Sequence, residues 1–287
     1  MVQTIVTHPG GAHKDDLLAV CVLAALHGAP IERREPTEGD LDDPETAVVD
    51  VGGRSEPTKL NFDHHHFPRD HAPTCALSLV LEHLGLYDDA KLFCEWLEPA
   101  EWFDSRGPNK TAEWLGVPRR AIAKLHSPID VTLLRRFAQA KSLAPGETLY
   151  EVLRFVGQDL LDYLHQIREQ IDAVASRVET WTLDVDGDAV EVLFFPRSEP
   201  MLDEPRAALA SYLHAEGREV AATIYPDRRG TGYGISRYED HPHLDFSALD
   251  GAPDVQFAHK SGFMCKTSAT TRERLSEIVA TAWRAAG

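Results

Sequence analysis

Residues 2–28 read VQTIVTHPGGAHKDDLLAVCVLAALHG, and this stretch decides the fold. The segment Val2–Thr7 predicts a short buried strand, and Gly10-Gly11 predicts the turn that follows it. Asp15-Asp16 is typical of a helix start, and the apolar residues after it run to His27-Gly28, where a glycine stop is expected. A strand, a turn and a helix in this order are the first pieces of an α/β fold.

Two further strands are predicted downstream. Ala47–Val51 (AVVDV) is apolar apart from its aspartate, and Gly52-Gly53 ends it. Leu60–Asp63 is a candidate third strand. Because buried strands alternate here with a helix, we expect an α/β domain with a mainly parallel sheet.

The rest of the chain changes its pattern twice. From about residue 74 to 141 the pattern is helical, with breaks expected at Pro99, Gly107-Pro108, Pro118 and Pro128. Apolar residues at helical spacing predict one long helix over 147–179. Further on we expect a hairpin turning at 186–188, a helix near 205–216, strands near 220–225 and 232–237, and a last helix from about residue 271. These patterns predict an N-terminal α/β domain over 1–146, a connecting helix over 147–180 and a smaller C-terminal α+β domain over 181–287.

The composition narrows the function classes. The chain has 287 residues, and 29 Lys and Arg against 46 Asp and Glu give a formal charge of −17. This charge disfavours binding of duplex nucleic acid along the whole surface, which needs clustered cations, but it is compatible with a local basic groove or a bound metal.

We expect no membrane segment. The longest apolar run, Leu17–Leu26, is shorter than the roughly 20 residues that span a bilayer. The N-terminus lacks a basic region followed by an apolar one, and the four cysteines form no C-x-x-C pair. These features predict reduced thiols and a cytoplasmic location.

Histidine and aspartate gather where the predicted strands end. His8 follows the first strand, His13 and Asp15 lie in the turn after it, Asp50 ends the second strand, and Asp63-His64-His65 follows the third. Ligands bind outside the carboxyl ends of parallel strands, so these groups are expected to meet in one crevice. Mixed imidazole and carboxylate ligands suit Mn²⁺, Fe²⁺, Zn²⁺ or Co²⁺ better than Ca²⁺, and two bridged metals can clamp a phosphoryl group. Asp15 and Asp16 alone would also fit a helix cap.

Four motifs in this order resemble a known family. They are THPGGAHKDD at 7–16, VVDVGG at 48–53, NFDHHH at 61–66 and FAHKSGF at 257–263. The DHH triplet and the H-x4-H-x-D spacing resemble the DHH phosphoesterase superfamily. The four motifs together resemble the melanocyte-proliferating-gene (MYG-type) exonuclease family of metal-dependent hydrolases.

The resemblance implies a ligand set. One metal would be held by His8, His13 and Asp50, and a second by Asp15, Asp50, His64 and Asp104, with Asp50 as the bridge. Asp104 best matches the family's fourth-motif aspartate, although the usual Asn-Gly after it is absent. Asp16 and Asp63 would orient neighbouring ligands, and His65 would face the substrate phosphate as a catalytic group.

The resemblance also implies a substrate-binding role for His259 and Gly262 in the C-terminal domain. Arg237, on a predicted strand, is a candidate to bind a phosphate through its guanidinium, and an ordinary exposed arginine is the alternative. The residues after Phe263 depart from the family's glycine-rich continuation. Phe263 and Tyr233 are candidates for stacking on a base, and each could equally be a core residue.

The function implied by the resemblance is a phosphodiesterase with two divalent metals, Mn²⁺ as first choice and Mg²⁺, Co²⁺ or Zn²⁺ as alternatives. It would act as a 3′→5′ exonuclease on single-stranded RNA or short oligonucleotides. One alternative is a small-substrate phosphoesterase acting on a cyclic dinucleotide, a nucleotide phosphate or pyrophosphate. Others are a metal- or nucleotide-binding protein without turnover and a structural zinc protein, which the lack of paired cysteines disfavours. The oligomeric state stays open, a homodimer included.

Overall fold

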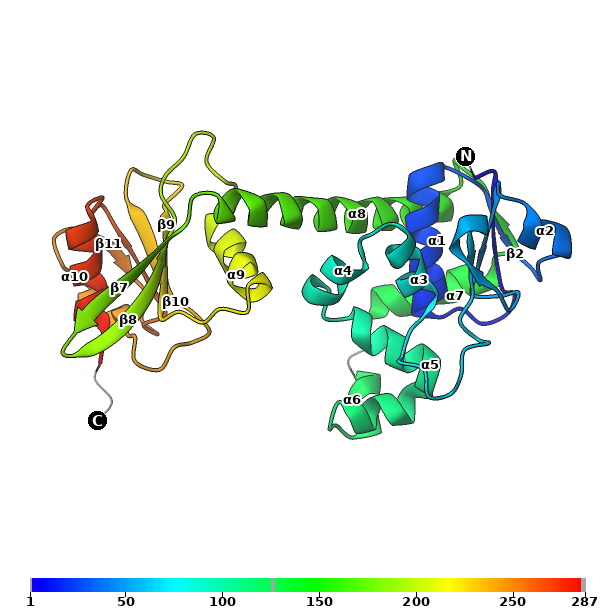
Figure 1. Cartoon of the computed structure of the whole chain (residues 1–287), viewed down its shortest axis with the longest axis horizontal. Helices are drawn as coiled ribbons and strands as arrows, with labels where there is room; N and C mark the ends of the chain where they lie inside the picture. Colours follow the sequence, from blue (N-terminus) through cyan, green and yellow to red (C-terminus); the bar gives the residue numbers. More distant parts are fainter. Residues whose placement is uncertain (1, 125–126, 285–287) are drawn as a thin grey trace. The chain divides into compact units, whose positions relative to one another are not determined.

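The computed structural model describes residues 2–124 and 127–284 and divides into two compact units, Met1–His165 and Gln166–Gly287 (Figure 1). The division falls inside the longest helix, α8 (Thr148–Ala175), which belongs to both units. The assignment of a catalytic and a substrate-binding role to the two parts of the chain remains a proposal.

The first unit contains a six-stranded sheet in the order β4-β5-β3-β1-β2-β6. Its strands are β1 (Thr4–Thr7), β2 (Ile31–Arg33), β3 (Thr46–Val49), β4 (Ser55–Glu56), β5 (Asn61–Phe62) and β6 (Ser142–Leu143). The four central strands run parallel, and the two edge strands β4 and β6 run antiparallel to their neighbours. The predicted α/β class with a mainly parallel sheet is confirmed.

Three strands of this sheet, β2, β4 and β6, were not predicted from the sequence. The longest of them, β2, lies between the first helix and residue 47 and pairs with β1. Its residues Ile-Glu-Arg include two charged side chains, so the short strand lacks an apolar signal.

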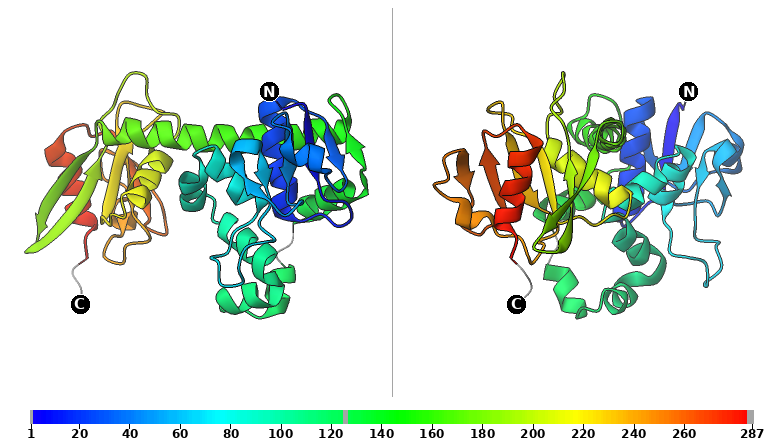
Figure 2. Two further views of the ribbon diagram at one scale, coloured as in Figure 1. Left: turned by 45° about the vertical axis from the view of Figure 1, so that its right-hand side comes forward. Right: turned by 60° about the vertical axis from the view of Figure 1, so that its left-hand side comes forward.

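Different helices cover the two faces of the first sheet, because side chains alternate along each strand. Ile5 of β1 packs into the main core with α1 (Lys14–His27). Its neighbour Val6 lies in a separate cluster with Leu41 of α2 (Glu38–Asp42) and Val48. Figures 1 and 2 show α1 and α2 on opposite sides of the strands. The carboxyl ends of the parallel strands meet at one edge between these layers.

The predicted helical region contains five helices. They are α3 (Ala76–His83), α4 (Tyr87–Phe93), α5 (Leu97–Trp114), α6 (Arg119–Lys124) and α7 (Pro128–Gln139), preceded by a 3₁₀ turn, η1 (Pro57–Lys59). The expected breaks at Gly107, Pro118 and Pro128 are confirmed. The break at Pro99 is wrong by two residues, since Pro99 lies in the first turn of α5, where its missing N–H is not needed.

The second unit is built on another six-stranded sheet, in the order β11-β12-β10-β9-β8-β7. Its elements are β7 (Glu179–Val185), β8 (Asp188–Phe194), α9 (Pro205–Ala215), β9 (Ala222–Pro226), β10 (Tyr233–Arg237), η2 (Phe246–Leu249), β11 (Val255–Ala258), β12 (Met264–Thr267) and α10 (Arg272–Ala282). All pairs are antiparallel except β8 with β9. Figure 1 shows α9 and α10 on opposite faces of this sheet. The hairpin, both helices, β9 and β10 match the expectation, whereas β11 and β12 were not predicted.

Two further properties follow from the described residues. By length and hydropathy, none of their helices could cross a bilayer. The four cysteines are all buried and free.

Candidate metal centre

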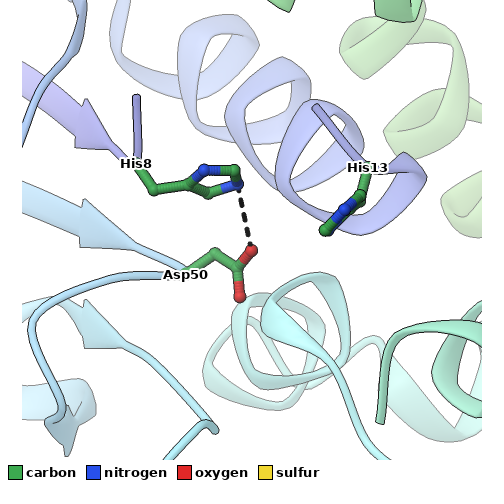
Figure 3. A group of neighbouring side chains, drawn as sticks. All are labelled: His8, His13 and Asp50. Carbon is green, nitrogen blue, oxygen red and sulfur yellow. Dashed lines mark ion pairs between the residues drawn. The ribbon is translucent and has the colours of Figure 1, made fainter. Parts of the chain in front are cut away.

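Three neighbouring parallel strands deliver ligand-type side chains to one edge of the first sheet. His8 follows β1, Asp50 follows β3, and Asp63 and His64 follow β5. Figure 3 shows the His8 ring pointing towards the Asp50 carboxylate, with His13 on the other side of it. His8 Nε2 lies 3.5 Å from Asp50 Oδ2.

The start of α1 supplies three more groups. His13 immediately precedes the helix, and its backbone N–H donates to Asp16 Oδ1 over 2.7 Å. Asp15 and Asp16 are buried in the first turn, where the positive end of the helix dipole favours carboxylates. Asp15 Oδ2 accepts a hydrogen bond of 3.3 Å from the backbone of Ala76 at the start of α3.

Asp104 reaches the same cluster from α5. Its Oδ2 lies 2.6 Å from His64 Nε2, and its Oδ1 lies 3.4 Å from His13 Nδ1. The structure therefore brings together all nine of the N-terminal residues singled out from the sequence. These are His8, His13, Asp15, Asp16, Asp50, Asp63, His64, His65 and Asp104.

Asp50 lies at the centre of the cluster. Its Oδ1 is 3.2 Å from His64 Nε2, while its Oδ2 faces His8, so the two oxygens approach different imidazoles. Its backbone has a φ of 57°, a left-handed conformation that aspartate tolerates better than most residues. This geometry suits a carboxylate shared by two cations.

Three sets of candidate ligand atoms lie within 4.8 Å of one another, and Asp50 belongs to each set. The sets are His8, His13 and Asp50; His13, Asp15, Asp50 and Asp104; and Asp50, His64 and His65. The first set equals the first ligand group implied by the resemblance. The second ligand group implied by the resemblance is split between the other two sets. Asp15 and Asp104 lie in a set with His13, whereas His64 lies in a set with His65.

Hydrogen bonds at the far nitrogens orient two of the imidazoles. His8 Nδ1 lies 2.9 Å from the carbonyl oxygen of Pro9, which can only accept, so Nδ1 carries the proton and Nε2 points to Asp50. His65 Nδ1 likewise lies 2.7 Å from Asp63 Oδ1. Such bonds fix the ring orientation of metal-binding and phosphate-binding histidines.

The cluster also holds buried polar atoms that approach one another as ion pairs but make no well-directed hydrogen bond with any of the described residues. They are His8 Nε2, Asp16 Oδ2, Asp50 Oδ1, His64 Nε2 and Asp104 Oδ2. Buried polar atoms rarely lack a partner, because their desolvation then goes uncompensated. A divalent cation among these nitrogens and oxygens would supply the partner, so the residues present fit a metal with mixed imidazole and carboxylate ligands.

Neighbouring carboxylates favour the protonated form of the histidines. The Asp16 carboxylate, 3.2 Å from His8 Nε2, is the main reason that the pKa of His8 rises from 6.5 to about 9. Burial lowers the pKa of His64, but the ion pairs with Asp104 and Asp50 outweigh this and raise it to about 10. Asp104 and Asp63 raise the pKa of His13 and His65 in the same way.

The carboxylates divide into two kinds. Burial, followed by repulsion from other carboxylates, raises the pKa of Asp15. Burial also raises the pKa of Asp50, although the ion pair with His64 acts in the opposite direction. Burial raises the pKa of Asp63, but hydrogen bonds donated by His65 and Gly53 outweigh it and lower the pKa to about 2. Burial acts on Asp104 in the same direction, but His13 and His64 hold the pKa of Asp104 below its usual range. Crowded carboxylates of this kind favour a bound cation.

Sequence reasoning missed Arg33, which shapes the loop between His8 and His13. Its buried guanidinium donates to the carbonyl oxygens of Gly11 and Phe137, both at 2.9 Å, and lies 3.7 Å from Asp16 Oδ2. An arginine in a short charged strand gives no signal of this role. Glu101 of α5 was missed too, a buried carboxylate that accepts hydrogen bonds from Ser78 and Tyr87.

The three predicted C-terminal residues lie in the second unit. The Arg237 guanidinium donates to Asp240 Oδ1 at 2.9 and 3.1 Å and borders a hollow of about 340 Å³ beside Arg206. His259 Nδ1 accepts from the backbone of Ser261 over 3.1 Å. Gly262 has a φ of 69° in the same turn, and a Cβ there would overlap the Asp245 carboxylate, which explains the glycine on structural grounds.

The two candidates for base stacking differ. Tyr233 is buried in the core of the second unit, where its ring lies 5.3 Å from that of Phe194, so the alternative that it is a core residue is correct. Phe263 is half-buried, and its ring centroid lies 4.1 Å from that of His259.

Comparisons with known proteins match part of the chain to a family. Residues 4–80 match the model MYG1_exonuc, described as Uncharacterised protein family (UPF0160), which confirms the resemblance carried by the first three motifs. Two crystal structures of RecJ from Thermus thermophilus also match, each at 15% identity over 97% of this chain. The Mn²⁺ complex has a TM-score of 0.28 with 52% of its chain covered, and the Mg²⁺ complex a TM-score of 0.29 with 49% covered. The chain thus spans about half the length of these RecJ chains. A search of curated proteins found no match.

Proposed function

We propose that this protein is a divalent-metal-dependent phosphodiesterase. The proposal takes as its premise that the first unit is a metal-dependent hydrolase domain of the DHH type. The proposed substrate is single-stranded RNA or a short oligonucleotide, which the protein shortens as a 3′→5′ exonuclease. The observation that carries the proposal is Asp50, whose two carboxylate oxygens face His8 and His64. The match of residues 4–80 to the MYG1_exonuc model supports the reaction class.

Two metals fit the ligand cluster. His8, His13 and Asp50 would hold one, and Asp15, Asp50, His64 and Asp104 the other. Mn²⁺ is the first choice, with Mg²⁺, Co²⁺ or Zn²⁺ as alternatives. When bound, such a pair acidifies water and neutralises the charge that develops on the phosphoryl oxygens.

His65 has the properties of a group that contacts the substrate phosphate. Its side chain is 61% exposed, and Asp63 holds Nδ1, so Nε2 is free to donate. The same hydrogen bond raises the pKa of His65 and so favours the protonated form of the ring. We therefore assign His65 to stabilise negative charge on the phosphate, with Asp63 holding the ring in place.

The second unit is proposed to contribute substrate contacts through His259, the Gly262 backbone and Arg237. Arg237 would exchange its partner Asp240 for a phosphate, because the carboxylate of Asp240 is itself 83% exposed. The four free, buried cysteines support a reducing compartment, and we propose a cytoplasmic location.

The test is hydrolysis of 5′-labelled single-stranded RNA by the full chain with Mn²⁺, with EDTA as control. We expect a ladder that shortens from the 3′ end by one nucleotide at a time. Duplex RNA of the same sequence should resist, and closed circular RNA should stay intact.

Other outcomes would assign other functions. Cutting of closed circular RNA would refute the exonuclease assignment. Hydrolysis of pyrophosphate or a cyclic dinucleotide, with oligonucleotides untouched, would favour the small-substrate phosphoesterase. Metal binding without hydrolysis of any phosphoester would favour a metal- or nucleotide-binding protein.

A further inference from the structure

Positive charge is concentrated in one part of this acidic chain. Residues 105–141 contain eight Lys and Arg but only two Asp and Glu, a net +6 against −17 for the whole chain. Arg119, Arg120, Lys124, Arg135 and Arg136 are exposed, and their side chains form no ion pair or hydrogen bond with any residue in 2–124 or 127–284. Unpaired cations on an acidic protein create a local positive potential that attracts anions.

Two tryptophans of α5 stack on each other, and the second, Trp114, precedes Arg119 by five residues. The ring centroids of Trp102 and Trp114 lie 4.9 Å apart, with their planes within 7° of parallel. In a straight helix, twelve residues would separate them by about 18 Å. The stack forms because α5 kinks at Gly107, whose φ of 76° and ψ of 166° are open to glycine and not to other residues.

Trp114 lies in an exposed segment of the chain. Every residue from Glu113 to Arg120 is exposed, and Trp114, Leu115 and Val117 are 37, 43 and 39% exposed. We call Trp114, Leu115, Val117, Arg119 and Arg120 the Trp114 surface. Within seven residues, this surface combines an exposed aromatic ring and two exposed aliphatic side chains with two unpaired guanidinium groups.

We propose that the Trp114 surface binds single-stranded nucleic acid, with an unpaired base stacked on Trp114 and phosphates at Arg119 and Arg120. An aromatic face next to unpaired cations is the combination with which proteins bind single strands irrespective of sequence. The rest of the chain has a formal charge of −17 − 6 = −23, so its overall field repels a polyanion. The choice of nucleic acid rests on the proposed function.

The Trp114 surface is distinct from the metal centre. Trp102 and Asp104 are two residues apart on α5, so they project from opposite sides of the helix. The stack is therefore separated from the Asp104 carboxylate by about one helix diameter, roughly 10 Å. A strand that occupies the metal centre would reach this surface with a different nucleotide, so only oligonucleotides longer than a dinucleotide can gain from it.

The first experiment measures binding of the full chain in EDTA, so that nothing is cleaved. Fluorescence anisotropy is recorded with a single strand of about 12 nucleotides, with an abasic strand of equal length and with a duplex. Trp114→Ala should weaken binding of the base-bearing strand about tenfold and leave the abasic strand unaffected, while Trp114→Phe should retain most of the affinity. The duplex should bind more weakly, because its bases are already stacked.

The second experiment tests the two arginines independently of the stack. Arg119→Glu with Arg120→Glu should lower the slope of log K against log salt by about 1.4, as expected for two lost phosphate contacts on a single strand. The control is Arg228→Glu with Arg229→Glu, an exposed adjacent pair in the second unit with the same change in net charge, in which Arg228 also loses its ion pair with Glu204. The control should keep the wild-type slope.

Several results would overturn the proposal. They are no binding of the 12-nucleotide strand in EDTA, equal binding of duplex, or equal losses in the arginine variant and its control. Each would leave the metal-dependent hydrolysis to be judged by its own assay with Mn²⁺. Conversely, a protein that binds single strands at this surface but hydrolyses nothing would keep this proposal and refute the proposed reaction.

Discussion

Asp50 is the residue on which the candidate metal centre depends most. Its position directly after β3, with a left-handed backbone, turns the carboxylate towards the ends of both neighbouring strands. Its two oxygens then face His8 on one side and His64 on the other. No other carboxylate of the described residues belongs to all three sets of candidate ligands.

Asp50→Asn tests this role. Asparagine also tolerates a positive φ, so the fold should be kept, while one neutral oxygen replaces the shared carboxylate. We expect activity on single-stranded RNA to fall at least about 100-fold and metal content to drop. The control is Asp70→Asn, an exposed loop aspartate in the same unit. Wild-type turnover of the Asp50→Asn protein with two metals bound would show that Asp50 is not the bridge.

Protons and metals compete for the same imidazoles. The pKa values of His8 and His64 are raised from 6.5 to about 9 and about 10, so protonation of these rings stabilises the metal-free fold below pH 6.5. That stabilisation is lost as the pH rises through 9 to 10. Metal binding needs neutral rings, so Mn²⁺ affinity should increase with pH across this window.

Titration calorimetry with Mn²⁺ in buffers of different ionisation enthalpy measures this competition. Near neutral pH we expect proton release on binding, because both rings must give up a proton. His27→Gln, at the other end of α1, should release as many protons as the wild type. Binding without proton release at any pH would mean that these imidazoles are not ligands.

Among the elements, α8 packs closely against α1, the helix that carries Asp15 and Asp16 of the candidate metal centre. A Cβ added at Gly157 of α8 would overlap the backbone carbonyl of Cys21 in α1, so the two helices can approach this closely only with glycine there. α1 carries Asp15 and Asp16 in its first turn, and their position depends on how α1 is seated on the sheet.

Gly157→Ala should therefore destabilise the protein although alanine is the better helix former. The gain in helix propensity is about 1 kcal/mol, but separating two packed backbones should cost more, with a net loss of about 1–3 kcal/mol. Urea denaturation followed by circular dichroism measures the change. Gln158→Ala, exposed on the same turn, is the control; it removes only a side-chain hydrogen bond of 2.8 Å to Asp162 and should change stability by less than about 0.5 kcal/mol. A stabilised Gly157→Ala protein would show that the helices can move apart freely.

At the scale of the whole molecule, the charge and the metals are linked. A chain with a formal charge of −17 that buries Asp15, Asp16, Asp50 and Asp63 at one sheet edge needs cations there. Without metal, protonated histidines supply part of this positive charge, but several buried nitrogen and oxygen atoms of the cluster then lack a well-directed hydrogen bond. Metals would satisfy the cluster more fully, so loading them should stabilise the first unit.

Hydrogen exchange with Mn²⁺ and with EDTA tests this link for each unit separately. At about 100 times the dissociation constant, Mn²⁺ should stabilise the unit that binds it by about 2.7 kcal/mol. Protection of the β1 and α1 amides should rise accordingly, while amides of β9 and β10 should change little. Equal protection in both units would contradict a metal centre confined to the first.

Local signals in the sequence account for much of the fold. The segment Val2–Thr7 predicts β1, the glycine at position 28 predicts the end of α1, and Asp186-Gly187 predicts the turn between β7 and β8. The strands that escaped prediction are short and contain charged or exposed residues; they are β2, β4, β6, β11 and β12. Their pairing depends on neighbours distant in sequence, and a local pattern does not record it.

By itself, the sequence determined that His8, His13, Asp15, Asp50 and His64 would meet, because strand ends in a parallel sheet converge whatever the loops do. Only the tertiary structure decided which oxygen of Asp50 faces which imidazole, that Arg33 ties the loop after β1 to α7, and that Asp104 arrives from a helix forty residues downstream of His64. It also decided that a kink at Gly107 stacks Trp102 on Trp114. Side-chain periodicity and strand order can be inferred from neighbouring residues, whereas these contacts join segments whose approach is set by the packing of the whole unit.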